Sequence, residues 1–544
     1  MKSIRVFIDA APQYASTLDL LSWVAHQDSI ESIEFVTITQ REGSQENQSH
    51  FAPRPPLNLL SKIRTFSFVH LMHLEKVFLK NQSNFNKCVE QISLDVPLAQ
   101  LIESFKVHAK QVTRTYSELL VDKYVECDLS VWLTSAEVPS AVRSNSKNGV
   151  ISIWRPTVAG NETSLPIFES VAAQSPFCSF QICIEGGKLS EQQVIFSGRC
   201  ATEFLVSASG FRGNAYAMHY LKLTLSSLLD GESLPPQRYA IDQELVTPAI
   251  PSIYLQANYV LSVATRFIRN KIRRLCGWSG FPAWEVYFSS TNWKDVGLHD
   301  HKSFPLNPRT FIADPFLVDV GGATYCFVEE LPLDSERGLI SVYQVSSSEA
   351  TYLGPAISEP FHMSFPYLFY YQDKLYMCPE ISQSREIRLY ECIDFPLQWQ
   401  HSNTLMREVA AADTMIFHHD ELWWMFTNFD PIRADDYCVE LNIFWSEDPT
   451  SSDWIPHSMN PILVDSTRAR NGGLLVDEEG IHRVAQSQGF ARYGESMQIF
   501  KIDELTKTRY SEHAVKAFTQ NVLGTKNGVH HMNSNGSITV FDGQ

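Results

Sequence analysis

A phrase made of a turn, a small polar or acidic residue and a short aromatic-rich strand recurs five times in the C-terminal half of the chain. The five copies are GGATYCFVEE from Gly321, QDKLYMCPE from Gln372, HDELWWMFTN from His419, EEGIHRVAQSQ from Glu478 and SNGSITVFDG from Ser534. Each follows an apolar first strand, and these are DPFLVDV from Asp314, FPYLFYY from Phe365, DTMIFHH from Asp413, NGGLLVD from Asn471 and HHMNS from His530. The pattern predicts five β-hairpins.

The spacing of the hairpins predicts how they assemble. Their starts at 314, 365, 413, 471 and 530 are 51, 48, 58 and 59 residues apart. Repeats of about 40 to 60 residues, each a small antiparallel sheet, are typical of a β-propeller, in which no blade can bury its faces alone. We therefore predict an all-β five-bladed propeller over residues 280–544. Because the last repeat ends at Gln544 without outer strands, we expect the strand WEVYF from Trp284 to complete that blade and close the ring.

Apolar strands alternate with helical patterns in the N-terminal half. The strands are IRVFIDA from Ile4, IEFVTI from Ile33, LSVWL from Leu129 and GVISIW from Gly149, and the amphipathic stretch from Leu98 to Leu120 has a helical pattern. This alternation predicts an α/β domain with a mostly parallel sheet over residues 1–235. No G-x-G-x-x-G motif follows the first strand, so the sequence does not support a nucleotide site.

Residues 236–279 are predicted to form a linker that carries a basic amphipathic helix. Apolar positions recur at helical spacing over 253–275, and five cations lie toward one end: Arg266, Arg269, Lys271, Arg273 and Arg274. One interpretation is peripheral membrane contact, since each cation near anionic headgroups contributes about 1 kcal/mol. The other is a helix that packs between the domains while its cations offset the helix dipole. Both stay open at this point.

Bulk properties narrow the class of protein. A chain of 544 residues that is 44% hydrophobic and 12% aromatic is expected to form two well-packed domains. The formal charge of -17 disfavours nucleic acid as a partner. The ten cysteines show no C-x-x-C pair, and the start MKSIRVFIDA shows no signal-peptide pattern. We expect a cytoplasmic location, or one peripheral to the inner membrane if the basic helix binds there.

Polar residues recur at matching places in the predicted inner strands. Asp314 to Glu329, Phe365 to Glu380, Asp413 to Asn428 and Asn471 to Gln486 are each 15 residues apart. Because inner strands surround the propeller axis, these groups are expected at one mouth of the channel. The predicted ring comprises Asp314, Glu329 or Glu330, Glu380, Asp413, Asn428, Arg470, Asn471, Gln486, Gln488 and one of His530 and His531.

Carboxylates that share a pocket suit glycoside chemistry, which needs one protonated acid and one ionised base or nucleophile. Asp314, Glu380 and Asp413 begin or end apolar strands, where an unpaired carboxylate would be costly, and are the predicted catalytic residues. Arg470 is expected to set the charge of Asp413. The other ring members are predicted to bind substrate. The chemistry requires no metal and no other cofactor.

A resemblance to a known family supports this chemistry. The phrases ADPFLVD, FPYLFYYQDKLYMCPE, ADTMIFHHDELWWMF and RVAQSQGFARYGE resemble the propeller domain at the N-terminus of glucosamine inositolphosphorylceramide transferases. That domain is similar to the five-bladed furanosidase propellers, whose first-blade Asp is base or nucleophile, which implies this role for Asp314. In those hydrolases the acidic Glu follows the middle-blade Asp, whereas Glu380 here precedes Asp413. The resemblance implies glycan chemistry and leaves hydrolysis and transfer both open.

A second resemblance concerns residues 127–231, whose order of elements resembles the N-terminal domain of formyltransferases. Ser152 and Trp154 stand where that family has its Asn and His, and no Asp follows within EGGKLSEQQ. Tryptophan cannot shuttle a proton. The resemblance therefore implies a domain that has lost formyl transfer, unless another histidine such as His108 enters the pocket.

Three functions follow from the sequence. The leading prediction is a carbohydrate-active enzyme that acts on a glycosidic bond, by hydrolysis or transfer, in the synthesis of a surface glycan or glycolipid. The first alternative is a non-catalytic glycan-binding or scaffold protein that serves a partner glycosyltransferase. The second is formyltransferase-type modification of an amino sugar.

Overall fold

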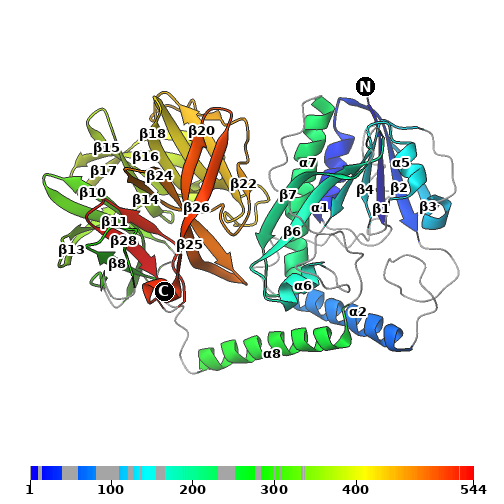
Figure 1. Cartoon of the computed structure of the whole chain (residues 1–544), viewed down its shortest axis with the longest axis horizontal. Coiled ribbons are helices and arrows are strands. Elements are labelled where there is room, and N and C mark those ends of the chain that lie inside the picture. The colour runs from blue at the N-terminus through cyan, green and yellow to red at the C-terminus, as the bar shows by residue number, and fades with distance from the viewer. Residues whose placement is uncertain are drawn as a thin grey trace. The chain divides into compact units, whose positions relative to one another are not determined.

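The computed structural model of the chain describes residues 2–9, 15–39, 59–80, 109–119, 126–134, 138–154, 166–187, 189, 191–230, 251–275, 284–297, 301–306, 309–332, 335, 337–525 and 527–544. The chain separates into two compact units, Met1–Ile268 and Arg269–Gln544 (Figure 1). Within the described part of the chain, no helix combines the length and hydropathy that a bilayer crossing requires.

The first unit is built on a seven-stranded sheet with the order β3-β2-β1-β4-β5-β6-β7. The strands are β1 (Lys2–Asp9), β2 (Ile30–Thr39), β3 (Ala109–Thr115), β4 (Leu129–Leu133), β5 (Val150–Trp154), β6 (Phe177–Glu185) and β7 (Gln193–Ala201). Pairing is parallel from β3 to β5 and antiparallel from β5 to β7. The predicted α/β fold with a mostly parallel sheet is confirmed.

Helices cover both faces of this sheet. The helices that precede the propeller in the described part of the chain are α1 (Ala15–Ala25), α2 (Leu59–Lys80), α4 (Tyr116–Leu119), α5 (Ser140–Ser144), α6 (Pro166–Ala172), α7 (Val206–Asp230) and α8 (Ile253–Leu275). On one face, Tyr220 of α7 stacks on Phe196 and Phe180 of the sheet. On the other, Val142 of α5 packs in a core cluster with Phe7 and Trp132. Alternate residues of each strand therefore enter two different cores.

The helical pattern predicted over Leu98–Leu120 is wrong for its second part, because residues 109–115 form the edge strand β3. Its residues pair in parallel with β2, from Ile33↔Ala109 to Thr39↔Thr115. The alternating sequence AKQVTRT suits an edge strand, and tertiary pairing outweighed a weak helical periodicity. Residues 98–108, and with them His108, lie outside the described residues.

The segment that resembles a formyltransferase contains the strands and the long helix expected of it. Ser152 is buried in β5, where it pairs with Trp132 of β4 and Cys183 of β6. Trp154 is the last residue of the same strand. The arrangement agrees with an α/β layer fold, and the assignment to that family stays a prediction.

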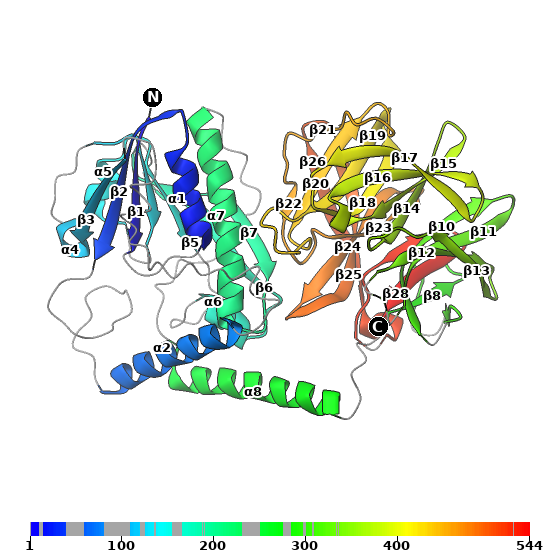
Figure 2. The same ribbon diagram turned by 180° about the vertical axis from the view of Figure 1, so that it is seen from behind.

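The second unit consists of five antiparallel sheets, four of which follow one another along the chain (Figure 2). Blade one contains β10 (Thr310–Val320), β11 (Ala323–Pro332), β12 (Leu339–Val345) and β13 (Ala350–Ile357). Blade two contains β14 (Ser364–Tyr371), β15 (Lys374–Glu380), β16 (Glu386–Asp394) and β17 (Gln398–Arg407), with a 3-10 turn at Ser382–Ser384. Blade three contains β18 (Ala411–His419), β19 (Leu422–Phe429), β20 (Glu440–Ser446), β21 (Ile455–Pro456) and β22 (Leu463–Val464). Blade four contains β23 (Asn471–Asp477), β24 (Gly480–Gly489), β25 (Arg492–Leu505) and β26 (Tyr510–Thr519), and the short helix α9 (Gln520–Leu523) follows it.

The fifth blade joins the two ends of the unit, in the order β27-β28-β8-β9. Its strands are β27 (Met532–Ser534), β28 (Thr539–Gly543), β8 (Glu285–Ser289) and β9 (Lys302–Ser303). Figure 1 shows the red β28 beside the green β8, and the pairing runs from Thr539↔Ser289 to Gly543↔Glu285. The predicted five-bladed propeller, with an early strand that closes the ring, is confirmed.

Candidate active site on the propeller axis

The inner strands of blades one to three begin with the same backbone irregularity. In each, a β-bulge interrupts the pairing, and Asp314, Phe365 and Asp413 at these bulges have positive φ angles of 52°, 45° and 48°. A non-glycine residue at positive φ is uncommon, and bulges re-aim side chains next to functional sites. The fourth blade places its bulge between Asn471 and Leu474, where a Cβ on Gly472 would collide with the carbonyl oxygen of His530. Glycine is therefore required where that blade approaches the fifth.

Asp413 lies in a buried ion cluster with Arg470 and Glu380. The Nε atom of Arg470 is 2.6 Å from Oδ2 of Asp413, and its Nη2 atom is 3.5 Å from Oε2 of Glu380. Gln486 donates to the same Asp413 oxygen at 3.0 Å. Burial and the neighbouring Glu380 together raise the pKa of Asp413 to about 7, against the opposing charge of Arg470. Two carboxyl groups at one site thus hold a proton near neutral pH.

The amides of Asn428, Asn471 and Gln486 hold the backbone around this cluster. Asn428 donates to the carbonyls of Glu440 and Ala469 at 2.9 and 2.8 Å and accepts from the backbone N–H of Asn471 at 2.9 Å. Asn471 donates to the carbonyl of Asp413 at 2.9 Å, and Gln486 donates to that of Asn471 at 2.7 Å. All three amides are fully buried. Their contacts suit a frame that fixes Asp413 better than direct contact with a ligand.

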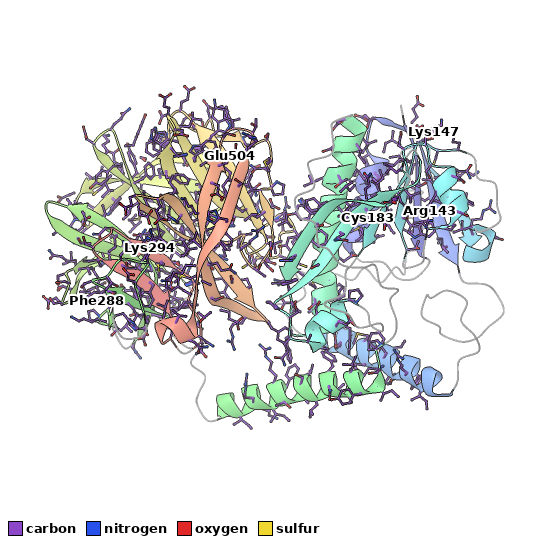
Figure 3. All side chains as sticks on the ribbon, in the orientation of Figure 1. Arg143, Lys147, Cys183, Phe288, Lys294 and Glu504 are labelled. Carbon is purple, nitrogen blue, oxygen red and sulfur yellow. The ribbon has the colours of Figure 1, made fainter. Side chains whose placement is uncertain are left out.

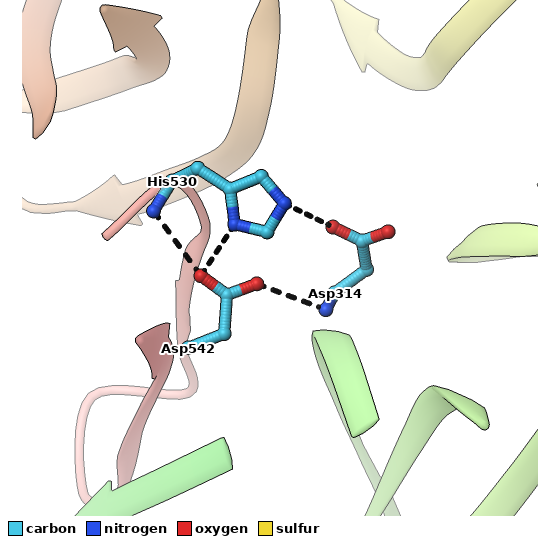
Figure 4. Close-up of side chains that lie close together, drawn as sticks. All are labelled: Asp314, His530 and Asp542. Atoms are coloured by element: carbon cyan, nitrogen blue, oxygen red, sulfur yellow. Dashed lines mark hydrogen bonds and ion pairs between the residues drawn. The ribbon is translucent and has the colours of Figure 1, made fainter. Parts of the chain in front are cut away.

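Asp314 faces a second buried cluster, formed with His530 and Asp542 (Figure 4). One oxygen of Asp542 accepts from the backbone N–H groups of His530 and His531 at 3.2 and 3.0 Å and bonds to Nδ1 of His530 at 2.7 Å. The other accepts from the backbone N–H of Asp314 at 3.1 Å. The Nε2 atom of His530 lies 3.7 Å from Oδ1 of Asp314. Asp542 therefore orients the imidazole toward Asp314.

Within this second cluster, the charge of His530 opposes the rise that burial causes in the pKa of Asp314. Burial works against charge at Asp542, yet His530 and the donated hydrogen bonds hold its pKa below the usual range. Burial also works against charge at His530, yet Asp542 outweighs it and leaves the pKa of His530 raised. Burial raises the pKa of Asp314 well above its ordinary value, and the His530 cation opposes that shift. The propeller axis thus carries two buried carboxyl clusters, each with a cation that opposes the effect of burial on the pKa of its aspartate.

Ligand atoms of Asp314, His530 and Asp542 lie within 4.8 Å of one another, close enough to be tested as a metal centre. Three backbone N–H groups and Nδ1 of His530 already occupy the oxygens of Asp542. A hard cation needs six or more oxygens, or fewer with several waters. The arrangement fits a hydrogen-bonded relay better than a metal cage.

An exposed aromatic ring adjoins both clusters. The ring of Tyr493 is 41% exposed, lies 5.1 Å from the guanidinium carbon of Arg470 and meets His530 edge-on at 5.3 Å. Trp284 stacks on the ring of His530, with the ring centroids 4.0 Å apart. By contrast, Phe365 and Trp424 are buried in the packing of the blades. Tyr493 is the ring best placed for a sugar face.

The side chains of the remaining predicted ring members point in different directions. Glu329 lies beside His362, with Oε1 to Nε2 at 3.3 Å, whereas Glu330 accepts hydrogen bonds from Ser341 and Tyr352 on the outer strands β12 and β13. Of the two glutamates, Glu329 is the one at the axial strand end. Gln488 accepts the backbone N–H of Gly494 at 3.1 Å, a turn contact beside Tyr493.

His531 points into the aromatic packing instead of the acidic cluster. Its ring meets Phe316 at 4.5 Å and Phe365 at 5.3 Å, and burial lowers its pKa to about 3. Of the two predicted histidines, His530 is therefore the one beside Asp314.

Asp542, Trp284 and Tyr493 were not predicted as site residues. Asp542 lies near the end of the final strand β28, in the phrase FDG, which looks like an ordinary turn in the sequence. Trp284 precedes the first blade and Tyr493 lies at the start of β25 of the fourth, so the two rings meet only after ring closure. One feature of the sequence could have identified Asp542 as a site residue. The second strand of its blade ends with an acidic residue, as the second strands of blades one and two also end.

Comparison with known proteins shows which family the propeller resembles. Residues 299–541 match the family model described as glucosamine inositolphosphorylceramide transferase 1, N-terminal. The propeller is 32% identical over 251 residues to glucosamine inositolphosphorylceramide transferase 1 of Oryza sativa subsp. japonica, covering 43% of this chain and 33% of that protein. Identity to the Arabidopsis thaliana protein is 33% over 210 residues, covering 38% and 27%. The resemblance predicted for the propeller is confirmed, and the chain spans about a third of the length of these relatives.

Solved structures with a similar chain path include two glycoside hydrolases. Zg3597, a family 117 enzyme of Zobellia galactanivorans, gives a TM-score of 0.32 at 13% identity, covering 47% of this chain and 90% of its own. The catalytic domain of the Coprinopsis cinerea GH62 alpha-L-arabinofuranosidase gives 0.33 at 10% identity, covering 48% and 98%. The five-bladed fold of this chain is established by its own strand pairing.

Proposed function

We propose that the propeller acts on a glycosidic bond, by hydrolysis or by transfer, in the synthesis of a surface glycan or glycolipid. The observation that carries the proposal is the pair of buried carboxyl clusters on one axis, one beside Arg470 and the other beside His530. Asp413 has a pKa of about 7 beside Glu380, while Asp314 faces the His530 cation. Glycoside chemistry needs one carboxyl group that gives a proton and a second that acts as base or nucleophile, and the two clusters offer one carboxyl group for each role.

The roles follow from exposure and contacts. Asp413 holds the proton and is hydrogen-bonded to Glu380, which is the more exposed of the two carboxyl groups. Asp413 therefore passes its proton to Glu380 as Glu380 gives one to the leaving oxygen, and Arg470 holds the carboxylate that remains at Asp413. Asp314 attacks the anomeric carbon, or takes the proton of the water or acceptor hydroxyl that attacks it. Tyr493 supplies a face for the sugar ring. Asp542 and His530 are positioning residues for Asp314.

A second candidate function is favoured by the length of the relatives. The match covers about a third of proteins named as transferases, so a propeller of this type can hold a glycan for chemistry done elsewhere in a longer chain or by a partner glycosyltransferase. Such a role would need the exposed Tyr493 but no proton exchange between carboxyl groups.

The experiment measures sugar release and transfer from aryl glycosides, furanosides included, and from lipid-linked and nucleotide-linked sugars. Asp314→Asn and Glu380→Gln are compared with the unaltered protein, and Glu330→Gln serves as the matched control because that carboxylate faces the outer strands. We expect turnover in the unaltered protein and the control, and losses of roughly 100-fold or more in both axial variants.

Saturable glycan binding without turnover, equal in all four proteins, would exclude catalysis and favour the glycan-holding role. Binding lost only on Tyr493→Ala would then locate the glycan at the same axial face.

A further inference from the structure

Helix α8 displays an apolar stripe on its outer face. Tyr254, Leu261 and Ile268 are 73%, 66% and 59% exposed, and Ile272 continues the stripe. Spacings of seven, seven and four residues place these side chains on one side of a helix. Large exposed apolar side chains in one row are unusual for a protein surface and mark interaction sites.

The opposite face of α8 holds the helix to the first unit. Tyr259 donates to the carboxylate of Glu75 in α2, and Gln256 donates to the carbonyl of Arg64 at 3.1 Å. Arg266 lies over the ring of Phe204, with 4.5 Å between its guanidinium carbon and the ring centroid. Since these contacts fix the inner face, the stripe is directed away from the core of this unit.

Helix α2 shows the same design. Ile63, Phe66, Val69 and Leu74 are exposed, with Phe66 at 72%, and they lie on the side of the helix opposite the α8 contacts of Arg64 and Glu75. Figures 1 and 2 show α2 and α8 side by side at one end of the first unit. Two adjacent helices thus present apolar stripes that stay exposed among the described residues of the chain.

The charge of the two helices is opposite to that of the chain. The sequence of α8 contains five cations and neither Asp nor Glu, and that of α2 contains four cations, with the buried Glu75 as its one acid. The whole chain has a net charge of -17. Arg269 and Lys271 are exposed on either side of the α8 stripe. Apolar stripes flanked by cations complement a surface that has an apolar interior and anionic groups at its boundary.

We propose that α2 and α8 together dock the protein on a membrane surface that carries anionic headgroups. The helices lie in the plane of the interface, with the stripes at the boundary between headgroups and acyl chains and the cations among the lipid phosphates. The proposal does not depend on the proposed function, because lipid binding is measured without substrate or turnover.

The test is co-sedimentation of the full chain with vesicles of phosphatidylcholine alone and with vesicles in which about a third of the lipid is phosphatidylglycerol. We expect binding to the anionic vesicles that weakens as salt is raised. The triple variant Tyr254→Ser, Leu261→Ser and Ile268→Ser should bind more than tenfold more weakly. The double variant Arg269→Glu and Lys271→Glu should bind at least about 30-fold more weakly, since each lost cation alone costs on the order of fivefold and the anionic headgroups repel the added carboxylates.

Matched controls come from the propeller. Ile393→Ser with Val476→Ser removes two apolar side chains of similar exposure, and Lys302→Glu with Lys507→Glu reverses two exposed cations. Both control proteins should bind anionic vesicles like the unaltered chain. Equal binding by the stripe variant and its control would overturn the proposal. So would a folded protein that ignores anionic vesicles but forms dimers that the stripe variant abolishes, since the occupant would then be a second copy of the chain.

Discussion

Asp413 and Asp542 are both buried carboxylates beside a cation, yet their pKa values shift in opposite directions. Asp542 accepts three backbone N–H groups and the ring of His530, so its charged form is fully solvated by the protein. Asp413 has Arg470 and Gln486 but also adjoins a second carboxyl group, Glu380. The difference between the two sites lies in the number of donors and in the neighbouring negative charge, not in depth of burial.

This contrast predicts the pH dependence of stability. Asp413 has a pKa of about 7 in the folded protein and about 3.9 when unfolded, so the folded state holds the extra proton between these values. The unfolding free energy should therefore fall as pH rises from about 4 to about 7. Relative to the unaltered protein, Asp413→Asn should gain on the order of 1 to 4 kcal/mol across that window and no more above it. Denaturant unfolding at several pH values measures the difference, and a gain that grows toward low pH would contradict it.

Asp542 should act on the reaction through His530. In Asp542→Asn the pKa of His530 should fall, because the carboxylate that raises it is gone, and Asp314 should then lose its opposing cation and ionise at higher pH. We expect the acidic limb of kcat/KM against pH to move upward, together with a stability loss of about 2 to 4 kcal/mol. Histidine titration by NMR checks the first step. An unchanged His530 titration with reduced activity would leave only a structural role for Asp542.

The sequence shows which residues lie at the ends of apolar strands. It does not show in which direction their side chains point. Asp314, Asp413 and Arg470 could be found because each sits at the boundary of an apolar strand. Asn428 sits at such a boundary too, but its amide is consumed by backbone carbonyls from blade three and the segment before blade four. The side-chain amide at a strand end can bond to nearby backbone or point to the propeller axis. Which of the two occurs depends on residues of the neighbouring blade, which come close only when the ring has closed.

At the scale of the elements, turn chemistry and period-two patterning were strong enough to predict the hairpins of the propeller. The edge strand β3 was missed because its sequence is polar and its only strand partner is β2, which comes from far along the chain. The closing strand β8 was predicted by a topological argument: a last blade without outer strands must borrow them. A strand that forms only by pairing with a distant segment can be predicted from the sequence when a repeat lacks a strand, as for β8. Without such a repeat, as for β3, the sequence gives no comparable signal.

The closing strand gives a stability prediction. Phe288 of β8, labelled in Figure 3, is buried in a core cluster with Phe304, Tyr343 and Val540, which come from blades one and five. Phe288→Ala should lower the unfolding free energy by about 3 to 5 kcal/mol, since it leaves a cavity at the seam of the ring. The exposed Ile393→Ala should change it by less than about 0.5 kcal/mol. Denaturant unfolding measures both, and a loss for Phe288→Ala below about 1 kcal/mol would mean that the seam opens before the blades unfold.

At the scale of the whole molecule, the two units differ in how their hydrophobic cores are arranged. The first buries an α/β core in which Phe180 stacks on Phe196 and Tyr220, whereas the propeller distributes its core among the blades. The basic helices α2 and α8 concentrate positive charge in a chain that is acidic overall. Each unit therefore has its own core, and the positive charge of α2 and α8 lies in sequence outside the propeller blades.

Separate cores predict separate unfolding. Calorimetry of the full chain should show two transitions, because each unit buries its own apolar cluster. Phe180→Ala should lower the midpoint of one transition, and Phe288→Ala that of the other, each by roughly 6 to 20 °C for a loss of 3 to 5 kcal/mol. Both residues are almost fully buried, so the pair is matched in the size of the cavity it creates. If each variant instead lowered both midpoints equally, the units would unfold as one cooperative body, and changes at the helices of the first unit would be felt at the propeller axis.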